Sequence, residues 1–161
     1  MTKVRVARQE HETKPWEWER VTMVVLAIVG IFVAGYLSWA EVTGNNTACL
    51  NTGAVNCEAV QTSAYSKTLG IPVAVLGLLG YIAILGTVLM EDQLPILAQY
   101  GKTLVVVFGL FGVMFSVYLS LIEGTVLDKW CQWCVISAIL ISILFIIGSV
   151  RLWRFMDRLR H

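Results

Sequence analysis

Four long apolar stretches constrain this chain more than any other feature. None contains Asp, Glu, Lys or Arg in its interior, and they cover residues 21–40, 71–90, 104–122 and about 131–150. Each has close to the roughly 20 residues that an α-helix needs to cross about 30 Å of hydrocarbon. Because lipid offers no water to unpaired backbone groups, a spanning segment of this length is expected to be helical. The stretches therefore predict an all-α membrane protein, built as a bundle of four transmembrane helices.

Buried core helices of a soluble protein are the alternative interpretation, but they would require a polar shell. Hydrophobic residues make up 57% of this chain and charged residues 14%, against about 45–50% and about 25% in soluble domains. The composition therefore favours a membrane protein over a soluble one. A net charge of +1 argues against a nucleic-acid-binding surface.

The polar ends divide the chain into a membrane core and two tails. Residues 1–20 are predicted to form a cytoplasmic tail, residues 21–150 the four-helix catalytic domain, and residues 151–161 a second cytoplasmic tail. The first apolar stretch is too long for the core of a cleaved signal peptide, and a polar segment precedes it. It is expected to stay in the protein as a membrane anchor.

Basic residues cluster in both tails and are scarce in the connections between the apolar stretches. The tails hold Lys3, Arg5, Arg8, Lys14 and Arg20 at one end and Arg151, Arg154, Arg158 and Arg160 at the other. The first and third connections have one lysine each, Lys67 and Lys129. Since Lys and Arg are retained on the cytoplasmic side, both tails are predicted to lie there and these two connections outside.

The four cysteines fall on the predicted outer face. Cys49 and Cys57 lie in the first connection, and Cys131 and Cys134 open the fourth stretch as a CxxC. Disulfides form and persist in extracytoplasmic compartments. The CxxC spacing is typical of thiol–disulfide oxidoreductases, and the start of a helix stabilises the reactive thiolate. The sequence therefore predicts thiol–disulfide exchange at this face, with three cysteine pairings possible.

Other uses of the four cysteines are less consistent with their spacing. A structural zinc site would need about two to four residues between the members of each pair, whereas seven separate Cys49 from Cys57. A c-type haem site requires His directly after the CxxC, where Val135 stands. No metal is therefore expected. Two structural disulfides in a non-catalytic membrane scaffold remain the alternative to an enzyme.

Several further motifs accompany the cysteines, and together they form a specific pattern. They are Cys49-x7-Cys57, Ser63, Gly70-Ile71-Pro72-Val73, Gly77 and Tyr81, Val117-Tyr118-Leu119, and Cys131-Gln132-Trp133-Cys134. With these motifs the chain resembles the vitamin K epoxide reductase family, and specifically its bacterial members. The resemblance extends over nearly the whole predicted membrane core.

This resemblance implies a four-helix bundle around a quinone of the ubiquinone or menaquinone type, capped by the first connection. A short helix lying on the membrane is expected within residues 57–68. The resemblance also implies that electrons flow from a thioredoxin-fold protein to Cys49, through Cys57 to Cys131, and from Cys134 to the quinone. This flow would sustain disulfide bond formation outside the inner or plasma membrane of a bacterium.

The expected quinone pocket has four further candidate residues. The resemblance implies that Ser63 supplies a hydrogen bond to a quinone carbonyl, and Trp133, Tyr81 and Ala138 are candidates for the pocket wall. Animal enzymes that reduce vitamin K epoxide carry Asn and Tyr at the places where this chain has Val73 and Ala138. The difference weakens any claim of epoxide reduction and favours plain quinone reduction, with a vitamin K quinone/epoxide reductase activity as the alternative.

Many bacterial members of the family carry a fused thioredoxin-like domain after the bundle. The sequence stops at His161, so the expected partner is a separate extracytoplasmic thioredoxin-fold oxidant, together with the membrane quinone pool. The same cysteines also suit electron flow in the opposite direction, because direction depends on the potentials of the partner and the quinone pool.

The sequence also allows predictions about two acidic residues near the CxxC and about four glycines. Glu123 and Asp128 border the CxxC on the outer side, where they either handle protons or are merely solvated. Four glycines within the apolar stretches are expected to let neighbouring helices approach closely, namely Gly77, Gly80, Gly109 and Gly112.

Overall fold

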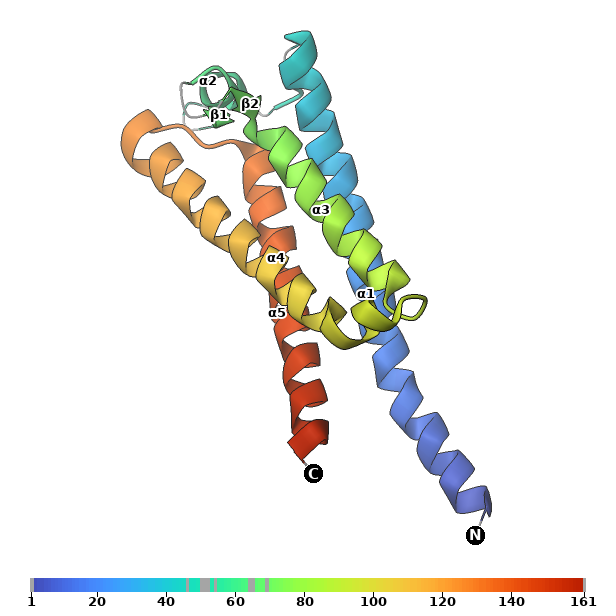
Figure 1. Ribbon diagram of the computed structural model, residues 1–161. Helices are drawn as coiled ribbons and strands as arrows, with labels where there is room; N and C mark the ends of the chain where they lie inside the picture. Colours follow the sequence, from blue (N-terminus) through green and yellow to red (C-terminus); the bar gives the residue numbers. More distant parts are fainter. Residues whose placement is uncertain are drawn as a thin grey trace.

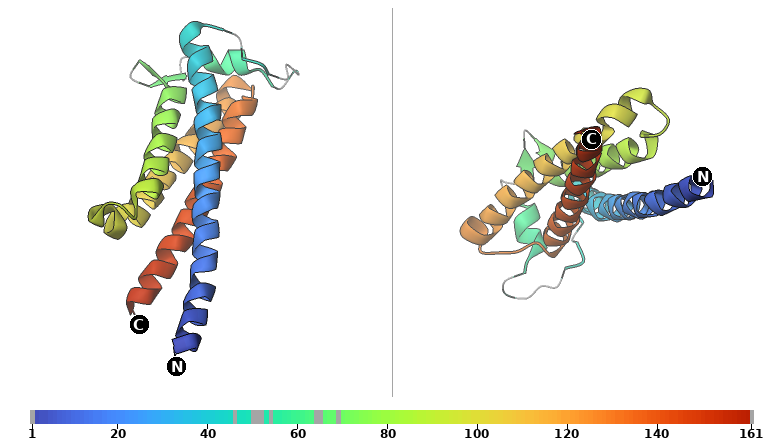
Figure 2. Two further views of the ribbon diagram at one scale, coloured as in Figure 1. Left: turned by 90° about the vertical axis from the view of Figure 1, so that its right-hand side faces the viewer. Right: turned by 90° about the horizontal axis from the view of Figure 1, so that it is seen from below.

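Four long helices form the body of the computed structural model, which describes residues 2–45, 47–49, 53, 55–63, 66–68 and 70–160. They are α1 (Thr2–Thr43), α3 (Val73–Met90), α4 (Pro95–Ile122) and α5 (Gln132–Arg160). Helix α1 packs along α3 and α4 packs along α5, and contacts of α3 with α4 and of α1 with α5 join the two pairs (Figure 1, Figure 2). The predicted all-α four-helix bundle is confirmed.

Each long helix contains a segment that is long and apolar enough to cross a membrane. These segments are Trp18–Thr43, Val73–Met90, Gln99–Leu127 and Gln132–Arg160. Large apolar side chains point outward, among them Phe32 and Phe111, which are 73% and 72% exposed. Extended apolar surfaces of this kind are rare on soluble proteins and are expected where helices face lipid. The chain is an integral membrane protein.

The third and fourth of these helices include charged residues that are buried and paired inside the bundle. Lys102 on α4 and Arg151 on α5 are both buried. Their side chains lie 2.6 and 2.9 Å from the carboxylate of Glu91, which directly follows α3. A charge in a spanning helix is tolerated when it faces the bundle interior and has a partner.

Close packing between α4 and α5 depends on glycine. A Cβ built on Gly109 would lie 3.2 Å from a neighbour on α5, and one on Gly112 would lie 2.7 Å from Ile141. The predicted packing roles of these two glycines are confirmed. The same prediction for Gly77 and Gly80 on α3 is wrong, because a Cβ there would meet no atom of the described residues within 4 Å. Both face open space instead.

Between α1 and α3 the chain forms a small cap. It contains the short helix α2 (Cys57–Gln61) and an antiparallel pair of two-residue strands, β1 (Lys67–Thr68) and β2 (Ile71–Pro72). The prediction of a helix within residues 57–68 is therefore correct only as far as Gln61. Beyond it, the Ser63 hydroxyl donates to the Val60 carbonyl at 2.6 Å, and such local bonds compete with a continuing helix. Gly70 then turns the chain with a φ of 82°, which glycine adopts without strain.

Both chain termini lie at the end of the bundle opposite the cap, and the α3–α4 connection lies toward the same end as the termini (Figure 1). The α4–α5 connection lies at the cap end. It includes η2 (Glu123–Leu127), a turn of π-helix that continues α4, and Asp128, whose backbone is left-handed with a φ of 47°. The first connection and the start of α5, which hold all four cysteines, thus meet at one end of the bundle.

Candidate active site

The four cysteines are divided into one disulfide and two thiols. Cys49 and Cys57 are bonded, with Cα atoms 6.2 Å apart, whereas Cys131 and Cys134 are free. Cys57 and Cys131 are completely buried, and Cys49 and Cys134 are half-buried. Each pair therefore has one sheltered sulfur and one partly accessible sulfur.

A short backbone contact joins the two pairs. Val55 and Trp130 form a parallel bridge, and the Asn56 N–H donates to the Trp130 carbonyl at 3.1 Å. Cys57 directly follows Asn56, and Cys131 directly follows Trp130. Because bridged backbone segments lie about 4.8 Å apart, this contact brings the two buried cysteines to one junction.

Cys131 lies at the N-terminal end of α5, where the first backbone N–H groups have no carbonyl partner within the helix. Its sulfur accepts a hydrogen bond from the Cys134 N–H at 3.4 Å, and its carbonyl accepts one from the Val135 N–H at 3.0 Å. A hydrogen bond from the Cys134 thiol lowers the pKa of Cys131 below its usual value, although burial opposes this effect. A helix N-terminus also favours a thiolate. Cys131 is therefore well suited to act as a thiolate.

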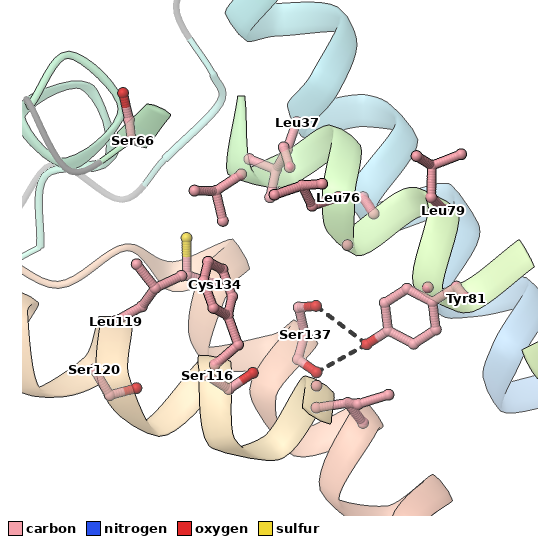
Figure 3. A pocket seen from close by; sticks show the side chains of 18 of the residues that line it. Leu37, Ser66, Leu76, Leu79, Tyr81, Ser116, Leu119, Ser120, Cys134 and Ser137 are labelled. Carbon is pink, nitrogen blue, oxygen red and sulfur yellow. Dashed lines mark hydrogen bonds between the residues drawn. The ribbon is translucent and has the colours of Figure 1, made fainter. Parts of the chain in front are cut away.

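A cavity of about 570 Å³ lies between the helices and the cap (Figure 3). Its walls are mainly apolar, with side chains such as Leu37 of α1 and Phe115 of α4. Gly77 and Gly80 of α3 line it too, and their missing side chains leave part of the space free. Figure 3 shows the Cys134 sulfur directed into this space. The volume and the apolar walls are typical of a small-molecule site.

A few polar groups interrupt the apolar walls. Ser63 and Ser66 come from the cap, and the Tyr81 hydroxyl donates to the Ser137 carbonyl at 2.9 Å (Figure 3). Glu41, near the end of α1, also lines the cavity. Its Oε1 atom is buried and has no hydrogen-bond partner among the described residues. Because an unpaired buried acceptor is costly, this atom suits a hydrogen-bond donor on a bound molecule.

Three of the five residues predicted for a quinone pocket line the cavity, namely Ser63, Tyr81 and Cys134. Trp133 and Ala138 are not among the residues that line it. The Ala138 carbonyl lies within α5, where it accepts a hydrogen bond from the Ser142 hydroxyl at 2.7 Å. The roles of Trp133 and Ala138 toward a quinone stay predictions.

Trp133 contacts the loop that carries Cys49. Its Nε1–H donates to the Ala48 carbonyl at 2.9 Å, and the Tyr36 hydroxyl accepts a hydrogen bond from the Ala48 N–H, also at 2.9 Å. The two aromatic rings pack together with centroids 5.3 Å apart. Helices α1 and α5 thus hold the residue before Cys49 by both of its backbone polar groups.

Several polar residues of the cavity were not found from the sequence. Ser116 and Ser120 lie one helical turn apart on α4, and Ser137 lies about one turn after Cys134 on α5. The available signal was the spacing of these small polar residues on one helix face within an apolar stretch. Glu41 gave no signal, because an acidic residue at the end of a spanning segment is usually solvated.

No group of three or more His, Cys, Asp or Glu side chains is placed to hold a metal ion within the part of the chain that the structure describes. A model of the vitamin K epoxide reductase family matches residues 21–148. That range includes the cap, all four cysteines and most of the membrane-spanning part of every long helix.

Proposed function

The chain belongs to the vitamin K epoxide reductase family, and on this premise we propose that it passes electrons from a thioredoxin-fold dithiol protein to a membrane quinone. Family membership makes the chain an oxidoreductase with quinone-linked disulfide chemistry. The proposal for the finer route rests on which sulfur atoms are accessible and which lie close together.

The route begins at Cys49, the half-buried member of the disulfide. A thiolate of the partner attacks its sulfur, forms a mixed disulfide and releases Cys57 as a thiolate. The partner's second thiol then resolves the mixed disulfide, so that the partner leaves oxidised and the loop pair is left as a dithiol. Exchange of this kind requires an accessible sulfur, which favours Cys49 over the fully buried Cys57.

The single observation that carries the proposal is the backbone contact between Asn56 and Trp130. It holds Cys57 and Cys131 at one junction, where the Cys57 thiolate can attack an oxidised CxxC at Cys131. The Cys131–Cys134 bond then breaks, and Cys49 regenerates the loop disulfide. The result is a reduced CxxC beside an oxidised loop pair, which is the arrangement found here.

The cavity supports a quinone as the final acceptor. Its apolar walls suit a quinone ring with an isoprenoid tail, the space beside Gly77 and Gly80 is free, and Cys134 opens into it. The unpaired Oε1 of Glu41 offers an acceptor to a hydroxyl of the reduced head group. A bound quinone of the ubiquinone or menaquinone type supplies a sink for two electrons and two protons.

The proposed setting is a bacterial inner or plasma membrane with the cysteines outside. Nine basic residues lie in the two terminal segments, and both termini lie at the end opposite the cap (Figure 1). Retention of basic residues in the cytoplasm would place the cap and the cysteines in an oxidising compartment. Disulfide bond formation in secreted proteins would then be the physiological outcome.

The test mixes the purified protein with a reduced thioredoxin-fold protein and a soluble ubiquinone analogue, and follows the quinone absorbance. We expect turnover by the wild type. Cys134→Ala should abolish quinone reduction while still allowing a mixed disulfide to be trapped at Cys49. A Cys49→Ala variant that oxidises the partner at the wild-type rate would show that the assigned order is wrong.

A second acceptor distinguishes plain quinone reduction from the alternative activity. Vitamin K epoxide replaces the quinone in the same assay, with product formation followed by chromatography. We expect no turnover, because Val73 and Ala138 stand where the animal enzymes have Asn and Tyr. Comparable rates with both acceptors would contradict this part of the proposal.

A further inference from the structure

Glu123 is a buried carboxyl group in the wall of the cavity. It is the first residue of η2, its side chain is only 3% exposed, and it lines the same cavity as Cys134. Burial of an unpaired carboxylate is costly. The groups that contact Glu123 therefore show what compensates for its burial.

Those groups belong to the CxxC. The Glu123 Oε2 atom accepts a hydrogen bond from the Cys131 N–H at 3.1 Å, and Cys134, which lines the same cavity, lies near enough for its thiol to interact electrostatically with this carboxyl group. The backbone carbonyl of Glu123 accepts one from the Lys129 N–H at 3.2 Å, which fixes the turn that carries the side chain. One carboxyl group thus binds the backbone of Cys131 and shares the cavity with Cys134.

Oxidation of the CxxC releases protons as well as electrons. Two S–H bonds break, one S–S bond forms between Cys131 and Cys134, and the quinone is reduced to the quinol by two electrons and two protons. The cavity walls are mainly apolar, so these protons need a positioned carrier. Positioned acid–base groups typically accelerate such a step by about 10²–10⁴-fold.

Other acid–base groups among the described residues are less well placed. Tyr81 already donates its proton to the Ser137 carbonyl. Glu41 also lines the cavity, but the groups that face its carboxylate are Lys67 and Ser66 rather than either thiol of the CxxC. Asp128, which borders the site in sequence, is exposed and does not line the cavity.

We propose that Glu123 is the proton carrier of the quinone step, taking the proton of the Cys134 thiol and delivering it to a quinone oxygen. The second proton is the one that Cys131 releases when it forms its thiolate. This inference rests on the proposed function and adds a catalytic residue to it. The hydrogen bond from the Cys131 N–H keeps the carboxyl group in place throughout the transfer.

Glu123→Gln separates proton transfer from charge. The amide has nearly the same size and still accepts from the Cys131 N–H, but it has no acidic proton and no negative charge. Because a nearby negative charge disfavours a thiolate, its loss should let N-ethylmaleimide alkylate Cys134 several-fold faster, as measured by peptide mass spectrometry. Quinone reduction by the reduced protein, followed by stopped flow, should nevertheless be slower by about 100-fold.

These opposite changes are the signature of a proton carrier. A group that only repelled the thiolate would, once neutralised, speed both reactions, so a quinone rate at or above that of the wild type overturns the proposal. Asp128→Asn removes the same charge at an exposed position and should change neither rate.

If a thermal melt shows that Glu123→Gln is not folded, Glu123→Asp provides the test instead. It keeps both the charge and the acidic proton, so alkylation should stay near the wild-type rate and quinone reduction within about tenfold of it. A quinone rate about 100-fold down in this variant would show that the shape of the side chain matters rather than its proton. Failure of the wild type to reduce quinone would instead contradict the proposed function, whatever the alkylation rates show.

Discussion

Cys131 and Cys134 belong to one CxxC but meet different surroundings. Cys131 is fully buried at the start of α5, and a hydrogen bond from the Cys134 thiol lowers the pKa of Cys131. A lowered pKa means that the thiolate persists to a lower pH than in an ordinary cysteine. In a background with Cys49 and Cys57 replaced by Ala, Cys134→Ala should therefore raise the titration midpoint of Cys131, measured by the ultraviolet absorbance of the thiolate.

Cys134→Ser is the matched control for that titration. Its hydroxyl can still donate to the Cys131 sulfur, so most of the lowering should remain. The same midpoint in the Ala and Ser variants would show that the helix N-terminus, rather than the neighbouring thiol, sets the pKa of Cys131.

Trp133 and Tyr36 hold the residue before Cys49 by its two backbone polar groups. Trp133→Phe removes the indole N–H and keeps a ring to pack against Tyr36. A single hydrogen bond contributes about 0.5–1.5 kcal/mol net, so amide hydrogen exchange in residues 47–49 should accelerate by about 2- to 10-fold. Trp153→Phe, at an exposed site on α5, should leave this exchange unchanged.

At the scale of elements, a charged cluster joins three helices near the termini. Glu91 follows α3 and pairs with Lys102 of α4 and Arg151 of α5, and all three side chains are at most 6% exposed. Glu91→Gln would remove the carboxylate that pairs with both buried cations. Removing one partner of a buried pair typically costs about 3–5 kcal/mol, so a large fall in thermal stability in detergent is expected.

The neighbouring Asp92 provides a control for this cluster. Asp92 pairs with Arg20 of α1, and its side chain is 65% exposed. Exposed ion pairs contribute about 0–1 kcal/mol, so Asp92→Asn should melt close to the wild type. Equal losses in the two variants would mean that burial does not determine the contribution of these pairs.

At the scale of the whole molecule, the sequence predicted the architecture because length and hydropathy alone require four spanning helices. It did not predict the buried charges on α4 and α5, because Lys102 and Arg151 interrupt the apolar pattern and only folding brings Glu91 between them. The sequence also could not show that Gly77 and Gly80 face open space. Glycines that permit helix packing and glycines that line a cavity have the same sequence pattern, and they differ only in which atoms lie opposite them.

The candidate site was predictable to a similar degree. Cysteine spacing separated a loop pair from a CxxC, because CxxC is a local pattern. The polar wall of the cavity was not predictable, because Ser116, Ser137 and Glu41 come together only across helices. The contact of Glu123 with the CxxC also depends on the π-helical turn of η2, which sequence periodicity does not indicate.

The molecule has opposite ends of different character, with the cysteines and cap at one end and both termini at the other (Figure 1). We expect the cap end to face outside the cytoplasm, since basic residues near spanning helices are retained inside. Asn45→Cys and Asp157→Cys, each in a chain with its four native cysteines replaced by Ala, place one exposed thiol at each end. A membrane-impermeant maleimide applied to intact cells should label the first variant and not the second.

Permeabilised cells provide the control for that experiment, because both variants should then be labelled to a similar extent. Labelling of Asp157→Cys alone in intact cells would place the cap in the cytoplasm. In that orientation Cys49 would meet a reducing compartment, where structural disulfides are rare. Electron flow from a cytoplasmic reductant would then replace the proposed oxidation of a secreted partner, so this one measurement tests the membrane orientation and the proposed direction together.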